Sequence, residues 1–313
     1  MNSRASTRGW WVLLAIVGVV LFFSAGLVLI LWTASPGDGV AMLGRDRIAV
    51  LPLRGVITAN HALLGQLKEY QRDGSVKGFV VHINSPGGEV APSQSIYRAL
   101  RAAREEGYPV VAVINSVGAS GAYYAALGAD TILALPGSLV GSIGVIMEFP
   151  NARELLEKVG LRYEVVKSGR FKDVGSPFRD ATPEDRALLQ EVVDDVYAQF
   201  VEAIAESRGM ERDSVSRVAD GRLLSGRQAA EYGLIDRVGD LNDAISLAGT
   251  MADLGPDPRT VTPRLRRRVT WLDLLTSVSR WAAEGGGALT GLSSTILERW
   301  IDSGPRLLYM IRQ

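Results

Sequence analysis

Residues 47–168 alternate short apolar runs of strand length with segments that are patterned as helices. The strand-like runs are RIAVLPLRG (47–55), VKGFVVHIN (76–84), YPVVAVINS (108–116), DTILALP (130–136), VGSIGVIM (140–147) and RYEVVKS (162–168). Neighbouring parallel strands need a long connection, which is usually a helix, so this alternation is typical of α/β proteins. The sequence therefore predicts an α/β fold with a largely parallel sheet.

Two helices are predicted from apolar spacing and from their end signals. Residues 91–107 place Ile96, Leu100 and Ala103 on one face, and Gly107 supplies a stop. After Thr182, a proline and two acidic residues complete the signature of a helix N-terminus. The apolar stripe of this second helix comprises Leu188, Val192, Val196, Phe200 and Ile204. We expect the stripe to pack on the sheet or on a partner subunit.

The stretch 9–35 contains no charged residue and is mostly apolar. A membrane-spanning helix needs roughly 20 apolar residues, whereas the apolar region of a signal peptide has only about 7–15. We therefore predict an uncleaved transmembrane anchor over residues 9–33. Arg4 and Arg8 precede it, and its near C-terminal flank offers only Asp38. By the positive-inside rule, residues 1–8 are cytoplasmic, and everything after the linker 34–45 lies outside the cytoplasm of a single-pass membrane protein.

Composition excludes several classes of function. The chain has 34 basic and 34 acidic side chains, so no net charge favours nucleic acid as a partner. It contains no cysteine, which excludes disulfides and thiol catalysis. His61 and His82 are its only histidines, so we expect no metal centre built on histidine.

Ser120 stands in the segment SVGASGAYYAALGAD, residues 116–130, among residues with almost no side chain. Gly and Ala at the start of a helix can serve close packing on a sheet. They also suit a serine nucleophile, which needs room for a substrate carbonyl, free backbone N–H groups for an oxyanion, and preferably a helix N-terminus. The segment alone does not decide between packing and catalysis.

A nucleophilic serine needs a base, and neither histidine is well placed to be one. Both precede Ser120, whereas the histidine of an α/β-hydrolase follows its nucleophile, and the local pattern is not G-x-S-x-G. The order Asp, His, Ser is formally available through Asp46. However, His82 lies within a strand-like run and His61 within a polar turn.

Lysine is the remaining choice for the base. Lys167 and Lys172 stand ahead of the predicted second helix, in a segment rich in Gly, Ser and Pro. A lysine base at neutral pH needs its pKa lowered from about 10.4 by about three units, which burial in an apolar site can supply.

Residues 251–313 differ in character and are predicted to form a C-terminal amphipathic extension. A basic cluster, PRLRRRV (263–269), precedes apolar residues that share one helical face. These are Trp271, Leu274, Leu275, Val278 and Trp281. Such a face suits a membrane surface, or, as the more common case, it caps the core or a neighbouring subunit.

Four motifs together resemble the signal peptide peptidase A family of membrane-anchored Ser–Lys proteases, in its short form with one catalytic domain. They are NSPGGEV (84–90), VGASGAYYAALGAD (117–130), GSIGVI (141–146) and SGRFKDVGSPFRDATPED (168–185). The resemblance spans about residues 48–247, and the apolar N-terminal stretch fits it too. It implies a Clp protease/crotonase-like fold, a ββα superhelix, for a protease domain at 46–250. The His and Asp of Clp protease have no counterparts here.

The resemblance also assigns the site residue by residue. It makes Ser120 the nucleophile and Lys172 the general base, and it leaves Lys167 as a bystander. Ser142 corresponds to a serine that hydrogen-bonds the lysine amine.

The oxyanion hole of the family falls on two glycines of this sequence. The N–H groups of Gly121 and Gly88 would form it, with Gly87 as the alternative to Gly88.

The implied reaction is hydrolysis through an acyl-enzyme, without metal or cofactor, on cleaved signal peptides and other membrane-proximal peptides. A long form of the family carries two copies of the domain, and serine and lysine come from different copies. This chain has one copy, so the resemblance implies a homo-oligomeric ring in which a neighbouring protomer supplies Lys172.

Two alternatives are a catalytically silent membrane scaffold and an acyl-CoA-handling relative of the crotonases. Ser120 together with Lys172 disfavours the scaffold, and a location outside the cytoplasm disfavours coenzyme A.

Overall fold

The computed structural model describes residues 46–59, 62–263 and 307–310, which belong to a compact unit that begins at Asp46. The predicted transmembrane anchor and the predicted amphipathic helix around residues 271–281 lie outside the described residues. Within the described ranges, no helix is long and apolar enough to span a membrane.

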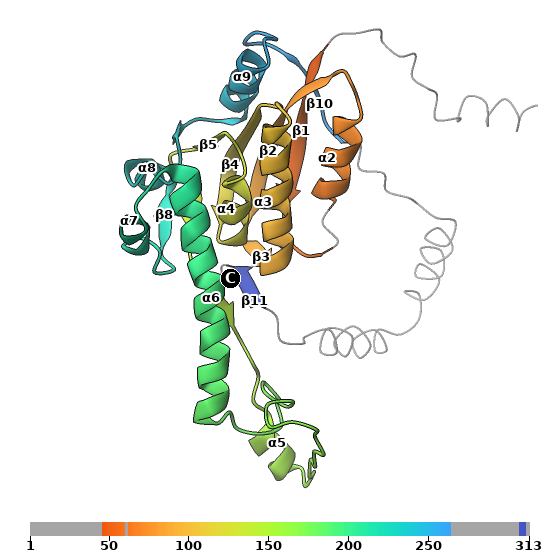
Figure 1. Ribbon diagram of the computed structural model, residues 1–313, viewed down its shortest axis with the longest axis vertical. Coiled ribbons are helices and arrows are strands. Elements are labelled where there is room, and N and C mark those ends of the chain that lie inside the picture. Colours follow the sequence, from red (N-terminus) through yellow and green to blue (C-terminus); the bar gives the residue numbers. More distant parts are fainter. Residues whose placement is uncertain (1–45, 60–61, 264–306, 311–313) are drawn as a thin grey trace, which may run out of the picture. The chain divides into compact units, whose positions relative to one another are not determined.

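The unit is built on a mixed sheet whose main path runs β10-β1-β2-β4-β5-β9, with all neighbours parallel (Figure 1). β6 extends the far end of β4 in parallel, and β8 pairs with β6 antiparallel. The strands are β1 (Arg47–Arg54), β2 (Val76–Ser85), β4 (Val110–Ala119), β5 (Thr131–Ala134), β6 (Leu139–Gly141), β8 (Leu223–Ser225), β9 (Arg237–Val238) and β10 (Arg259–Val261). The predicted α/β class is confirmed, and the mixed sheet fits the Clp protease-like architecture. Because β10 adds an edge strand, the sheet continues past the expected domain boundary at residue 250.

Helices cover both faces of the sheet, which explains why its strands read as almost continuous apolar runs. On one face lie α2 (Leu63–Gln71), α3 (Val90–Glu105), α4 (Gly121–Ala126) and part of α6 (Pro183–Arg208). On the other face α9 (Leu241–Met251) packs Ala244 and Ala248 against apolar side chains of β1, β2, β4 and β5. Tyr123 of α4 is fully buried and donates its hydroxyl to the Leu234 carbonyl at 2.7 Å, which fixes the start of α4 in the core.

The N-terminus of α6 forms as predicted. The Thr182 side chain accepts from the Asp185 N–H at 3.1 Å, and the Asp185 carboxylate accepts from the Thr182 N–H at 3.0 Å, which is a capping box. The predicted stripe is buried only in its second half. Val196 and Phe200 lie in the core, whereas Val192 is exposed. The first turns of α6 therefore carry apolar surface that the described chain does not cover.

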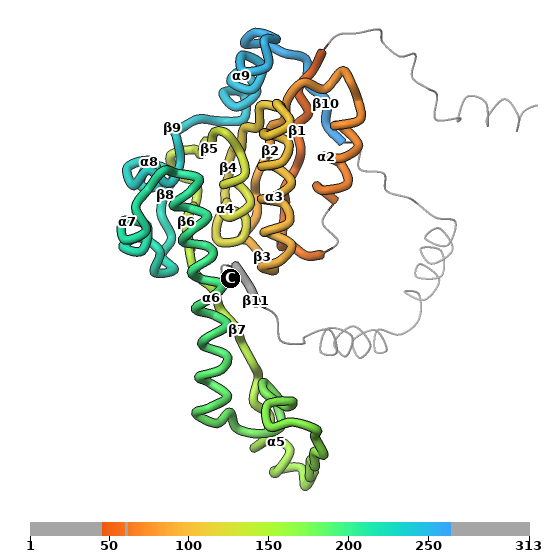
Figure 2. The backbone as a smooth tube through the Cα atoms, viewed as in Figure 1, coloured from red at the N-terminus to blue at the C-terminus, as the bar shows by residue number. Residues whose placement is uncertain are grey.

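One strand prediction was wrong. The run RYEVVKS (162–168) forms no strand, because no described strand lies beside it to accept its hydrogen bonds. Its apolar side chains Tyr163, Val165 and Val166 are exposed. The run belongs to a segment that leaves the sheet through β7 (Ile146–Met147), includes α5 (Arg153–Lys158) and returns along α6 (Figure 2).

A second, three-stranded antiparallel sheet lies beside the main one, in the order β3-β11-β7. β3 (Gly87–Glu89) follows β2 almost directly, and β11 is Leu307–Met310. Through this small sheet, the last described residues of the chain pair with β3, which contains Gly87 and Gly88. The remaining short helices, α7 (Arg212–Ser216) and α8 (Gly226–Glu231), flank β8.

Candidate active site

Ser120 lies at the sharp turn between β4 and α4, in a backbone conformation that residues with a side chain rarely adopt. Its φ is 54° and its ψ is −121°. Such a conformation costs roughly 1–3 kcal/mol and persists only where the surroundings hold it. The Ser120 N–H donates to the Gly141 carbonyl at 2.7 Å, and the Ser120 carbonyl accepts from the Tyr124 N–H at 2.9 Å. A strained strand-to-helix turn of this kind is how α/β-hydrolases present a nucleophilic serine.

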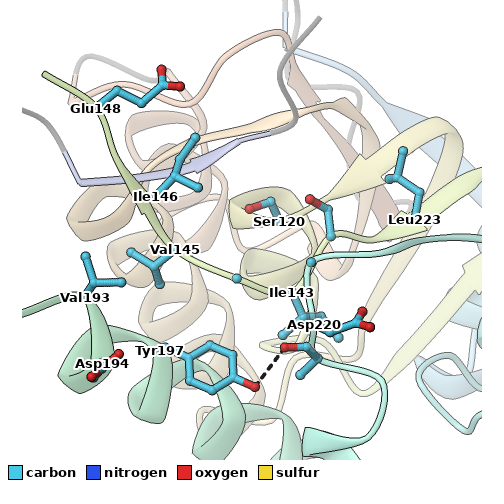
Figure 3. A pocket seen from close by; sticks show the side chains of 14 residues that line it. Ser120, Ile143, Val145, Ile146, Glu148, Val193, Asp194, Tyr197, Asp220 and Leu223 are labelled. Atoms are coloured by element: carbon cyan, nitrogen blue, oxygen red, sulfur yellow. Dashed lines mark hydrogen bonds between the residues drawn. The ribbon is translucent and has the colours of Figure 1, made fainter. Parts of the chain in front are cut away.

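A cavity of about 650 Å³ opens at Ser120 (Figure 3). Its walls combine apolar and polar side chains and come from the chain around β7, from α6 and from β8. The apolar lining residues are Ile143, Val145, Ile146, Val193 and Leu223. Tyr197 of α6 also lines it and donates its hydroxyl to the Ala219 carbonyl at 2.8 Å, so its ring is held in place. The apolar part of the wall can receive an apolar side chain close to Ser120.

Three acidic residues line this cavity, Glu148, Asp194 and Asp220, and the last of them is paired with an arginine. Asp220 lines the wall, and its side chain accepts two hydrogen bonds from the Arg222 guanidinium, at 2.7 and 2.5 Å. This pairing lowers the pKa of Asp220 to about 2. Asp220 therefore stays ionised at neutral pH, and a carboxylate with so low a pKa is a weak base for the proton of Ser120.

The two candidate oxyanion donors lie on different elements near Ser120. Gly121 is the first residue of α4 and follows the serine directly. In β3, the Gly87 N–H donates to the Ser85 hydroxyl at 3.2 Å and the Glu89 N–H donates to the Ile57 carbonyl at 2.9 Å. Because successive N–H groups of a strand point to opposite sides, the N–H of Gly88 faces β11 instead. The Gly87 N–H is therefore used within the turn after β2, whereas the Gly88 N–H lies on the edge of β3 that pairs with β11.

Glycine at position 88 has a structural cause that the sequence analysis did not anticipate. A Cβ atom at Gly88 would lie 2.2 Å from the carbonyl oxygen of Ile57. Position 88 therefore requires glycine because its Cα packs directly against the main chain of Ile57.

The structure brings Ser142 to the cavity but not Lys172. Ser142 follows β6 with a φ of 49°, donates its N–H to the Arg222 carbonyl at 2.7 Å, and lines the same cavity as Ser120. Lys172 is exposed in the segment between β7 and α6, and it is absent from the cavity lining. Within the described chain, Ser120 and Lys172 therefore do not share a site.

The two lysines of this segment differ in their contacts. Lys167 donates to the Asp173 carboxylate at 2.6 Å and to the Arg170 carbonyl at 3.0 Å. No ion pair to Lys172 is found among the described residues. Lys167 is thus engaged as a structural cation, whereas the amine of Lys172 is available.

Sequence reasoning missed several residues that shape the site. Tyr197 and Val193 were hidden within the pattern of a long helix, and Asp220 stands in a short polar loop. β11 had only a weak signal, a four-residue apolar run far from every motif.

The fold and the strained serine at a cavity are features that serine hydrolases share. Comparison with known proteins makes the class more specific. Residues 102–255, which include Ser120 and Lys172, match peptidase family S49. A protein of Synechocystis sp., slr0021, whose name describes it as a candidate protease, is 41% identical over 215 residues, 68% of this chain and 77% of its own length. The chain therefore belongs to peptidase family S49 and is a serine peptidase.

Two further relatives agree with this family. MJ0651 of Methanocaldococcus jannaschii, also named as a candidate protease, is 32% identical over 259 residues, 78% of this chain and 83% of its own length. The chloroplastic serine protease SPPA of Arabidopsis thaliana is 30% identical over 268 residues, 81% of this chain and 38% of its own length.

Proposed function

We propose that this chain is a membrane-anchored endopeptidase that uses Ser120 and Lys172 as a catalytic dyad and degrades cleaved signal peptides and other membrane-proximal peptides. The observation that carries the peptide part is β11. It is an extended segment inserted between β3 and β7, at the cavity of Ser120. Tyr309 stands opposite Gly88, and Leu308 stands opposite both Glu89 and Ile146.

A peptide substrate can use the same two strand edges. Strand addition supplies main-chain hydrogen bonds on both sides, whatever the sequence, while alternate side chains meet the cavity walls. Ile146 both pairs with β11 and lines the cavity, so a strand held there passes beside the apolar walls. This arrangement favours extended, apolar segments, which is the chemistry of the core of a signal peptide.

The proposed reaction is acyl transfer. Ser120 Oγ attacks the peptide carbonyl while the neutral amine of Lys172 takes its proton. The N–H groups of Gly121 and Gly88 stabilise the oxyanion, and Lys172 then protonates the leaving amine. Water hydrolyses the acyl-enzyme in a second step with the same base. Ser142 would hydrogen-bond the lysine amine and orient it.

We further propose that Lys172 reaches a Ser120 cavity of a neighbouring protomer. The segment that carries it has the surface of an unfilled interface, because α5 buries none of its residues. Its exposed apolar side chains are Leu155, Val159, Leu161, Tyr163, Val165, Val166 and Phe171. A patch of this kind marks a protein contact, and a second copy is the partner that would bring the missing base.

Digestion of synthetic signal peptides by the detergent-solubilised protein tests the proposed activity, with products read by mass spectrometry. We expect internal cleavage and labelling of Ser120 by a fluorophosphonate. A silent scaffold would give neither product nor label. Cleavage with no preference for apolar segments would contradict the substrate class.

The anchor makes its own prediction. Because Arg4 and Arg8 flank the apolar stretch on its N-terminal side, we expect protease added outside spheroplasts to remove the catalytic unit and leave a short anchor fragment. A C-terminal tag and an N-terminal tag followed by immunoblotting distinguish the two parts. Protection of the catalytic unit would place it in the cytoplasm and refute this topology.

β11 and a substrate strand cannot pair with the same edges at once, which predicts competition. Proline at positions 308 and 309 removes the N–H groups that face β3 and β7. We expect the variant Leu308→Pro/Tyr309→Pro to show a KM several-fold lower, on the order of 3–10-fold, with kcat unchanged, since KM scales inversely with the open fraction. Gln313→Pro, beyond β11, is the control. An unchanged KM in the double variant would mean that β11 leaves the site open in solution.

A further inference from the structure

The segment around Lys172 is built from consecutive tight turns and not from a helix or strand. The Lys172 N–H donates to the Gly169 carbonyl at 3.2 Å, and the Ser176 N–H donates to the Asp173 carbonyl at 3.1 Å. A loop alone holds a side chain less precisely than a regular element does, so a base placed here needs support from outside the loop.

Arg179 supplies that support through two carboxylates. Its guanidinium donates to both oxygens of Asp173, Nε at 2.9 Å and Nη2 at 3.0 Å, and Nη1 hydrogen-bonds Asp185. The Asp173 side chain is 12% exposed and that of Asp185 is 4% exposed. Asp173 is the residue next to Lys172, so the bidentate contact acts directly on the turn that carries the lysine.

The other end of the bridge is fixed to the body of the protein. Asp185 closes the capping box of α6, and α6 buries Val196, Phe200 and Ile204 in the core. The same helix places Val193 and Tyr197 in the wall of the Ser120 cavity. Through Arg179, the turn at Lys172 is tied to the N-terminus of a helix whose second half is immobilised by packing.

The charges of this cluster balance. Asp173 and Asp185 are the two acids, and Arg179 and Lys167 are the two bases. The hydrogen bonds from Arg179 lower the pKa of Asp173, and they lower that of Asp185 to about 2. Both carboxylates therefore stay ionised, and the bridge persists at neutral and mildly acidic pH. It is lost only as pH falls further, toward the folded-state pKa of Asp185.

We propose that Arg179 is a positioning residue for the catalytic base, and that it fixes the turn at Lys172 to α6 by bridging Asp173 and Asp185. The proposal rests on the role of Lys172 in the proposed function. Arg179 touches neither substrate nor Ser120 in this arrangement. Its effect reaches the reaction only through the placement of the lysine amine.

The kinetic signature of this role is a loss in kcat. We expect Arg179→Ala to lower kcat by about 100-fold, because a displacement of about 1 Å costs that much, while KM for a peptide stays within about twofold. Arg170→Ala is the matched control. Arg170 also joins this loop to α6, through Glu184 at 3.4 Å, but both side chains are more than half exposed, so its loss should change kcat less than twofold.

Mixed assemblies separate positioning of Lys172 from a general structural role. If Lys172 acts on a neighbour, Arg179→Ala protomers mixed with Ser120→Ala protomers should recover activity, because the second type donates an intact lysine turn. Arg179→Ala mixed one-to-one with Lys172→Ala should fall to about half the level of Arg179→Ala alone, since half of the protomers donate no lysine and none donates an intact lysine turn. A defect in folding or assembly would not follow this pattern.

Arg179→Lys covers the case in which Arg179→Ala fails to assemble, because it keeps the charge but cannot bridge both carboxylates. It should assemble and still lose kcat. Normal kcat in Arg179→Ala would overturn the proposal, as would rescue by Lys172→Ala protomers or failure of both Arg179 variants to assemble. The failure of the proposed function looks different. Full activity of Lys172→Ala would refute the Ser120–Lys172 dyad itself. If Lys172 instead serves its own protomer, mixed assemblies are not informative, and the loss of kcat in Arg179→Ala alone tests the role of Arg179.

Discussion

Ser120→Ala and Lys172→Ala are each expected to abolish peptide cleavage, with losses on the order of 10⁴-fold or more in kcat, whereas Lys167→Ala keeps most of the activity. Removing either member of a nucleophile–base pair costs nearly as much as removing both, because they act as a unit. Lys167 is already paired with Asp173 at 2.6 Å, and Arg179 continues to hold that carboxylate when Lys167 is lost. The measurement is cleavage of one apolar peptide under saturating conditions.

Two controls make that result interpretable. Circular dichroism and thermal unfolding should be unchanged for Lys172→Ala, since an exposed side chain without an ion pair among the described residues contributes little to stability. Lys172→Arg keeps the positive charge but provides no base near neutral pH, and it should be as inactive as Lys172→Ala. Equal losses in the two lysine-to-alanine variants would refute the assignment of Lys172, and residual cleavage by Ser120→Ala would refute the nucleophile.

The sheet was predictable because it is buried on both faces. β1 and β5 lie within predicted runs, and β2 and β4 begin within theirs and extend past them by one and three residues. Their apolar residues show no alternation because helices cover each side of the sheet. The same criterion failed at residues 162–168. An apolar run becomes a strand only where another strand offers hydrogen bonds, and the described chain brings none to RYEVVKS. Sequence shows the composition of a strand but not its partner.

The candidate site was predictable only where it is local. Small residues around Ser120 indicated a tight turn, and the structure has one, with φ at 54°. The cavity wall, in contrast, is assembled from residues up to about a hundred positions away, such as Tyr197 and Leu223, which no motif joins to the serine. The contact between β11 and Gly88 spans even more of the chain. Such pairings depend on how the sheet closes, which a single sequence does not reveal.

Co-assembled Ser120→Ala and Lys172→Ala protomers are expected to recover activity that neither variant has alone. The structure separates Lys172 from the Ser120 cavity of its own chain, and the segment between β7 and α6 exposes apolar surface for a neighbour. In a closed ring with head-to-tail contacts and random one-to-one mixing, about a quarter of the contacts join an intact serine to an intact lysine. Activity should therefore approach about a quarter of that of the wild type. Purification through two different tags followed by a peptide assay measures it.

Wild type mixed one-to-one with the double variant Ser120→Ala/Lys172→Ala gives an independent reading of the same geometry. If each protomer builds its own dyad, half of the protomers stay active, and activity is about half that of the wild type. If the lysine comes from a neighbour, only about a quarter of the contacts have both groups intact, by the same counting. The two mixtures must agree. Rings that contain both single variants and remain inactive, together with half activity in the second mixture, would mean that Lys172 serves its own chain, and the segment after β7 would then have to fold back onto the Ser120 cavity.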